Sequence, residues 1–200
     1  MKNSLSVIIL ISIISFCVQS CSKDSIESPK TTSLEITLRD DLGNLIQGAT
    51  VKLYPSETDY KNQTNSVSVK TSNASGIVTF DNLTSMKYYF SADKDCLSNA
   101  FGGNATASSL VLNQKHNSVC VLGKTGTLKF TNLSSNPYDI YLNGTLTIQN
   151  MPGGAIRQYL APAANYSIRV LQKSGYILFP TDKTYTGNLT CGLTLTTTFP

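Results

Sequence analysis

Hydrophobic and polar residues alternate in short runs along most of the chain after residue 33. In the first run, polar residues separate Leu34, Ile36 and Leu38, which is typical of a strand with one buried face. Glycine, asparagine, aspartate and proline bound the runs, and no long run with helical periodicity follows residue 21. The pattern predicts an all-β protein. The expected strands cover 34–39, 49–54, 67–69, 77–80, 87–92, 110–112, 119–122, 128–130, 138–142, 146–148, 156–160, 166–171, 177–179 and 191–195.

One polar stretch and one glycine-rich stretch interrupt these strands. Residues 55–65 are polar and are expected to form a loop, and residues 96–108 are rich in glycine, asparagine and alanine and are expected to be irregular. Asn143–Gly144 is a strong hairpin signal. We place a domain boundary at 123–126, which predicts two tandem antiparallel β-sandwiches at 33–123 and 126–200.

The N-terminus has the pattern of an export signal. Lys2 precedes an apolar run at 5–16, which is too short for a membrane-spanning helix of about 20 residues. The residues from Val18 to Cys21 resemble the lipobox of bacterial lipoproteins. That resemblance implies a signal peptide at 1–20, diacylglycerol and further acyl chains (such as palmitate) on Cys21, and a flexible tether at 21–32. A plain secretory signal cleaved after Ser20 is the alternative.

The residues after Cys21 bear on localisation. Ser22, rather than aspartate, follows the cysteine, and by resemblance to lipoprotein sorting this implies the outer membrane, at the cell surface or on the periplasmic face. The polar tether resembles that of Bacteroidetes-type lipoproteins, and Asp24-Ser25-Ile26 resembles their O-glycosylation site. An unmodified linker is the alternative for these three residues.

Both halves resemble known β-sandwich families. In the first, "LEITLRDDLGNLIQGATVKLY" and "VKTSNASGIVTFDNLTSMKYYFSA" resemble the carboxypeptidase regulatory-like (transthyretin-like) and Cna-B-like family over about 31–95. In the second, "GTLKFTN", "NPYDIYLNG", "YLAPAANYSIRV" and "SGY" resemble PEGA-like domains, although "PGGA" at 152–155 replaces the Pro-Glu-Gly-Ala signature. The first resemblance implies a module that spaces, stiffens or binds without catalysis.

Composition and motifs argue against several functions. The formal net charge is +4 and no basic run is present, so nucleic acid is not an expected partner. The single histidine, His116, lies in a polar segment and is interpreted as a solvated turn residue rather than a catalytic base. The pairs Asp40–Asp41 and Asp93–Asp95 could bind calcium, but acids in turns more often cap them. We therefore expect no cofactor, no metal and no catalytic residue.

Three of the five cysteines remain once Cys17 leaves with the signal and Cys21 is acylated. Cys96 and Cys120 enclose the irregular stretch, and a disulfide between them would stabilise the fold by about 3 kcal/mol. Two reduced, buried thiols are the alternative. Cys191 alternates in phase with Leu193 and Leu195, so we predict that it is a small core residue.

Tyrosines supply the remaining binding candidates. Tyr138 and Tyr166 have the phase of core residues, whereas Tyr141 and Tyr159 have the opposite phase and could stack on sugar rings at the surface. We predict a non-enzymatic lipoprotein of the cell envelope with a structural, binding or adhesive role, joined to a membrane through its lipid. The alternatives are an accessory glycan-binding subunit of an outer-membrane polysaccharide capture system and, less favoured, a hydrolase of unknown type.

Overall fold

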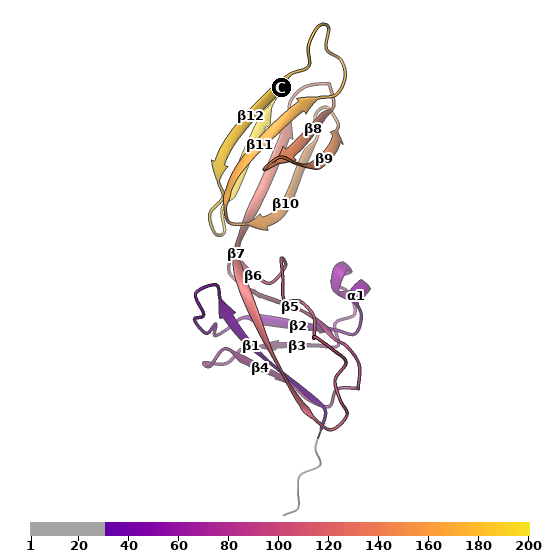
Figure 1. Ribbon diagram of the computed structural model, residues 1–200, viewed down its shortest axis with the longest axis vertical. Coiled ribbons are helices and arrows are strands. Elements are labelled where there is room, and N and C mark those ends of the chain that lie inside the picture. The colour runs from indigo at the N-terminus through magenta and orange to yellow at the C-terminus, as the bar shows by residue number, and fades with distance from the viewer. Residues whose placement is uncertain (1–30) are drawn as a thin grey trace, which may run out of the picture.

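The computed structural model describes residues 31–200 as an elongated molecule made of two β-rich halves placed end to end (Figure 1). The predicted signal peptide at 1–20, the predicted lipidation site at Cys21 and the predicted glycosylation site at Asp24-Ser25-Ile26 lie outside the described residues. None of the helices within 31–200 has the length and hydrophobicity needed to cross a membrane. The all-β class is confirmed, with a single short helix in the described chain.

The first half is one curved sheet that wraps around a single core. Its strands occur in the order β3-β2-β5-β6-β7-β1-β4. They are β1 (Ser33–Asp40), β2 (Thr50–Tyr54), β3 (Ser68–Thr71), β4 (Ile77–Phe80), β5 (Tyr89–Lys94), β6 (Leu97–Ser98) and the first part of β7 (Lys115–Asn132). The alternating residues Leu34, Ile36 and Leu38 point into the core, as predicted, together with Tyr88 and Phe90.

The second half packs a four-stranded sheet, in the order β12-β11-β8-β9, against β10, β13 and the end of β7. Its strands are β8 (Tyr138–Leu142), β9 (Thr145–Met151), β10 (Ile156–Pro162), β11 (Asn165–Gln172), β12 (Asp182–Asn188) and β13 (Thr194–Phe199). Tyr138 and Tyr166 are buried in this second core, as their phase predicted. Asn143 and Gly144 both have positive φ, at 48° and 85°, which confirms the predicted hairpin between β8 and β9.

Strand β7 belongs to both halves. Its first part pairs with β1 from Lys115 to Leu122, and its last part pairs with β10 and β13 from Thr125 to Asn132. The pairings of β7 with β1 and β13 are parallel, whereas the sequence predicted antiparallel sandwiches. The predicted boundary at 123–126 therefore falls inside a continuous strand and not in a linker (Figure 1).

Three local predictions are wrong. Within the expected loop at 55–65, the structure has helix α1 (Glu57–Asn62), because Ser56 caps it by accepting the Asp59 backbone N–H at 3.1 Å. The expected strand at 110–112 is irregular, and Val111 and Leu112 face solvent. The expected strand at 177–179 is part of the loop between β11 and β12.

Candidate functional site

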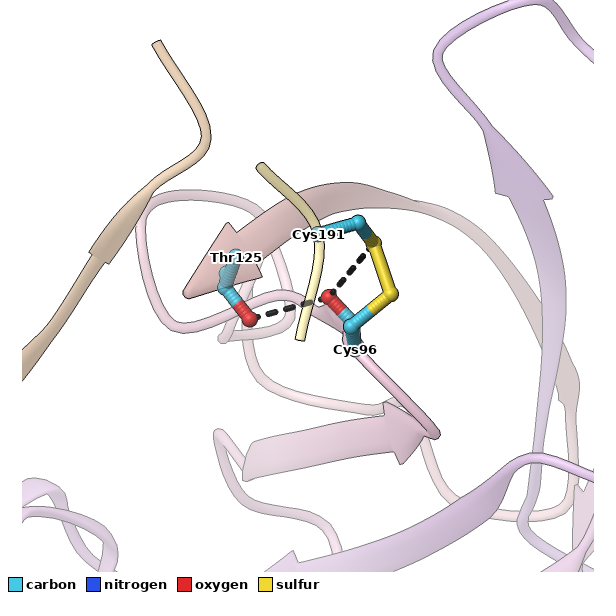
Figure 2. Close-up of a disulfide and its surroundings, with 3 residues drawn as sticks. All are labelled: Cys96, Thr125 and Cys191. Carbon is cyan, nitrogen blue, oxygen red and sulfur yellow. Dashed lines mark hydrogen bonds between the residues drawn. A yellow bond between two sulfur atoms is a disulfide. The ribbon is translucent and has the colours of Figure 1, made fainter. Parts of the chain in front are cut away.

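The junction between the two cores is the most distinctive feature of the described chain. A disulfide joins Cys96, in the turn between β5 and β6, to Cys191, in the turn before β13, with a Cα–Cα distance of 5.4 Å (Figure 2). The bond therefore links a residue of the first half to a residue of the second, 95 positions along the chain. It lies beside β7, the strand that the two halves share (Figure 2).

Thr125 ties this disulfide to β7. Its backbone N–H and its Oγ1 hydroxyl both donate to the Cys96 carbonyl oxygen, at 2.8 and 2.9 Å (Figure 2 draws the hydroxyl bond). Its own carbonyl oxygen accepts the N–H of Gly192 at 2.8 Å. The Cys191 sulfur also lies 3.6 Å from the Cys96 carbonyl oxygen, although a disulfide sulfur has no proton to donate. One residue of β7 thus contacts both turns that carry the disulfide.

Close backbone contact at the junction requires glycine at position 126. A Cβ on Gly126 would lie 2.7 Å from the Leu189 side chain and 2.8 Å from the carbonyl oxygens of Thr190 and Leu193. The turn before β13 can approach β7 only because that atom is absent. At Gly123, three residues earlier, a Cβ would meet nothing within 4 Å.

The predicted Cys96–Cys120 disulfide is wrong. Cys120 lies on the inward face of β7 with no exposed surface, inside the first core, and its thiol is free. Burial raises the pKa of the Cys120 thiol to about 12, so it is protonated and unreactive at neutral pH. Cys191 is likewise not a core residue, because it lies in a turn at the junction.

The predicted pair of surface tyrosines does not form one surface. Tyr141 is half-buried on β8, with the Arg169 guanidinium 5.3 Å from its ring centre. Tyr159 comes from β10 in the opposing sheet, packs against Phe130 at 5.8 Å and has a buried hydroxyl. Burial raises the pKa of Tyr159 to about 12. A sugar could not stack on both rings at once.

The remaining candidates have local structural roles. The Asp40 carboxylate accepts the backbone N–H groups of Leu42 and Asn44 and the Asn44 side-chain amide, which lowers the pKa of Asp40. Asp93 accepts the Ser98 hydroxyl at 2.6 Å. Within residues 31–200, no group of three or more histidine, cysteine or acidic side chains is placed to hold a metal ion.

His116 was expected in a turn but lies at the start of β7. Its Nε2 accepts the backbone N–H of Val111 at 2.7 Å. The ring therefore fixes the loop that precedes β7, and the expectation of a solvated turn residue is wrong.

A hollow lies on the outer side of β7 and is lined by residues of both halves. We define the junction hollow by Phe101, Val119, Val121 and Pro162, which make its walls mainly apolar. Its volume is about 400 Å³, and Lys124 is the one charged residue that lines it. The sequence signal for this hollow was the outward phase of Val119 and Val121, which alternate with the buried Cys120 and Leu122.

Comparison with solved structures finds distant similarity to two streptococcal pilins and to one protein of Bacillus anthracis. The Bacillus anthracis TIE protein is 15% identical with a TM-score of 0.33, over 84% of this chain and 33% of that one. A streptococcal ancillary pilin is 15% identical with a TM-score of 0.40, over 84% and 62% of the two chains. A minor pilin of Streptococcus agalactiae is 17% identical with a TM-score of 0.32, over 84% and 94%.

The chain thus spans about a third of the first of these proteins and under two thirds of the second. No protein-family model matches the sequence, and no curated protein matches it. The chain is distantly similar in structure to the β-domains of Gram-positive pilins.

Proposed function

We propose that the chain is a non-enzymatic spacer of the bacterial cell envelope, which holds its distal end away from a lipid anchor at Cys21. The proposal rests on two connections between the halves: strand β7 runs through both of them, and the Cys96–Cys191 disulfide joins them as well. Two separate attachments oppose bending about the junction, whereas a flexible linker would allow it. A disulfide is also typical of exported proteins, which supports a location outside the cytoplasm.

The start of the described chain supports attachment at one end of the molecule. The described chain begins, just before β1, at the end of the first half that is remote from the second half (Figure 1). Thr32 is buried there and is held by two hydrogen bonds. Its Oγ1 accepts the Asn113 N–H at 2.8 Å, and its carbonyl oxygen accepts the Leu83 N–H at 2.9 Å. A tether from Cys21 would therefore pull on the first core at its end, and the second half would extend outward.

The two side chains best suited to nucleophilic or base chemistry have structural roles instead. The Cys120 thiol is buried with a raised pKa, and the His116 ring accepts a backbone N–H. Both observations support a non-enzymatic role.

Metabolic labelling with an alkyne fatty acid tests the anchor. The wild-type chain should carry the label, partition with outer membranes and show a mass shift that globomycin abolishes, whereas Cys21→Ala should lose all three properties. Cys120→Ala is the control, because it removes a cysteine that the proposal does not acylate. An unlabelled wild-type chain would refute lipid anchoring.

Small-angle X-ray scattering tests the spacer. The chain from Ser22 contains every strand of both cores and should scatter as a single extended shape. A variant with three glycines inserted after Lys124, together with Cys96→Ser and Cys191→Ser, loses both attachments. Its radius of gyration should decrease, and its pair-distance distribution should become broader and less structured. If the wild-type chain already shows the broad distribution, the spacer proposal fails.

A further inference from the structure

The loop between β11 and β12 carries an exposed apolar segment. We define the tip loop as residues 175–180, in which Ile177, Leu178 and Phe179 are 98%, 80% and 85% exposed. Tyr176 beside them is 46% exposed. The loop projects beyond the sheets at the end of the molecule farthest from the start of the described chain (Figure 1). Contiguous exposed apolar side chains mark an interaction surface rather than an ordinary loop.

The base of the tip loop is anchored, so that its apex is presented to solvent. The backbone N–H of Gln172 donates to the Thr181 carbonyl oxygen at 2.8 Å, and the Gln172 side chain accepts the Thr181 N–H at 3.1 Å. The Lys173 N–H donates to the Pro137 carbonyl oxygen at 2.9 Å. These bonds close the loop beneath its apolar residues, so the sheet holds the apex in position.

We propose that the tip loop of one molecule docks in the junction hollow of a second copy of this chain. The loop is convex and apolar, and the hollow is concave with walls of Phe101, Val119, Val121 and Pro162. Residues 174–181 carry no charge, and Lys124 is the single charge in the hollow lining, so docking leaves few charges to desolvate. At about 400 Å³ the hollow is in the size range of pockets that enclose small apolar groups.

The contact must form between molecules. Strand β11 runs from the junction, at Asn165, to the base of the tip loop at Gln172, which separates the two surfaces by roughly 25 Å at 3.3 Å per residue. A tip loop cannot bend back over that distance while β11 stays paired with β8 and β12. Because the contact joins two different surfaces, repeated contacts give a closed ring where the rotation between copies closes and an open chain where it does not.

The charges near the tip favour a protein partner over a lipid bilayer. Two of the three cations near the base of the loop are held by acids, since Lys173 pairs with Asp139 at 3.0 Å and Arg169 pairs with Asp182 at 2.6 Å. Lys183 on β12 is exposed and pairs with no acid of residues 31–200. Paired cations contribute little attraction to anionic headgroups. A bilayer contact is therefore an outcome that the test must detect.

The contact is small, so the association is weak in solution. One loop in one hollow buries less area than a standard interface, and we expect a dissociation constant on the order of 100 µM. This inference goes beyond the proposed spacer function, because a strictly monomeric chain would leave the spacer proposal standing.

Sedimentation velocity on the chain from Ser22 tests the contact. The wild type should form larger species as its concentration rises through the expected dissociation constant. The tip variant (Ile177→Ser with Phe179→Ser) and the hollow variant (Val119→Lys with Val121→Lys) should each remain monomeric. All four substituted side chains are at least half exposed, so the substitutions spare both cores.

Mixing the two variants gives the sharpest result. The tip variant keeps an intact hollow and the hollow variant keeps an intact tip, so the mixture should form a dimer that does not grow. Recovery of association also shows that both variants are folded. Leu42→Ser is the matched control, because Leu42 is as exposed as Leu178, at 80%, but lies in a turn of the first half. That variant should associate like the wild type.

Three results would overturn the proposal. One is a wild-type chain that stays monomeric at ten times the expected dissociation constant, and another is a mixture of variants that stays monomeric. The third is binding of the chain to vesicles of phosphatidylcholine and phosphatidylglycerol that the tip variant loses while the wild type remains monomeric, which would assign the tip loop to a bilayer.

Discussion

Removing the Cys96–Cys191 disulfide should destabilise the fold strongly. The double substitution Cys96→Ser and Cys191→Ser opens a loop whose ends are 95 positions apart. In the chain-entropy model a loop of this length restricts the unfolded chain by about 4.7 kcal/mol, and measured losses for native disulfides fall at about 2–5 kcal/mol. We therefore expect the free energy of unfolding to fall by about 4 kcal/mol.

Thermal melts followed by circular dichroism measure this loss. For a chain of this size, about 4 kcal/mol corresponds to a decrease in melting temperature of roughly 8–16 °C. Reducing agent should lower the wild-type melting temperature to that of the double variant, and it should leave the double variant unchanged. Cys120→Ala is the control for the pairing, because it keeps the disulfide and should stay sensitive to reducing agent.

Two results would refute this reasoning. A double variant that melts within about 2 °C of the oxidised wild type would show that the cross-link does not restrict the unfolded chain. Loss of sensitivity to reducing agent in Cys120→Ala would instead show that Cys120 takes part in the disulfide.

Three further predictions concern single positions. Gly126→Ala should destabilise the fold by about 1–3 kcal/mol in a denaturant titration, because its Cβ has no room, whereas Gly123→Ala should have little effect, and equal losses at both glycines would contradict the close approach. The Arg169 hydrogen bond lowers the pKa of Asp182, so the stability it adds is present above the unfolded-state pKa and is lost as pH falls through the folded-state pKa. The melting temperature of Asp182→Asn should therefore lie below that of the wild type at neutral pH, and the two should melt at the same temperature in acid. A difference that persists in acid would show that the ionised Asp182 carboxylate is not the cause. In the chain from Ser22, Cys120 should be the single thiol that Ellman's reagent detects, only after unfolding, and a thiol that reacts in the native state would contradict its burial.

Alternating patterns predicted the strands that bury one face. Leu34, Ile36 and Leu38 enter the first core, and Tyr138 and Tyr166 enter the second, because successive side chains of a strand point to opposite faces. The hairpin at Asn143–Gly144 was predictable because few residues other than asparagine and glycine adopt positive φ at both turn positions. These features depend on neighbours in sequence, and for that reason the sequence alone revealed them.

The continuity of β7 depends on partners that are distant in sequence. Gly123 and Gly126 indicated a break, and the segment before Val119 is polar, so neither propensity nor pattern predicted a long strand. The strand extends because β1 pairs with its first part while β10 and β13 pair with its last part. Gly126 marks a close contact with another segment, which is one of the meanings that a glycine inside a strand can have.

The sequence could have excluded Cys120 from the disulfide, but it could not have predicted that Cys96 pairs with Cys191. Cys120 has the same phase as Leu122, which places it inside the first core, while Asp95-Cys96 and Cys191-Gly192 both carry turn residues with positive φ beside the cysteine. That contrast separates Cys120 from the other two cysteines. Bringing Cys96 to Cys191 still requires the end-to-end placement of the two halves, which no local pattern encodes.

We propose that β7 and the disulfide hold the two halves as one rigid body. Backbone ¹⁵N relaxation of the oxidised chain from Ser22 measures this rigidity. Amides of both cores should fit one elongated diffusion tensor, and amides 123–126 should be as ordered as their neighbours in β7. Separate diffusion tensors for the two halves, with increased motion at 123–126, would show that the junction bends.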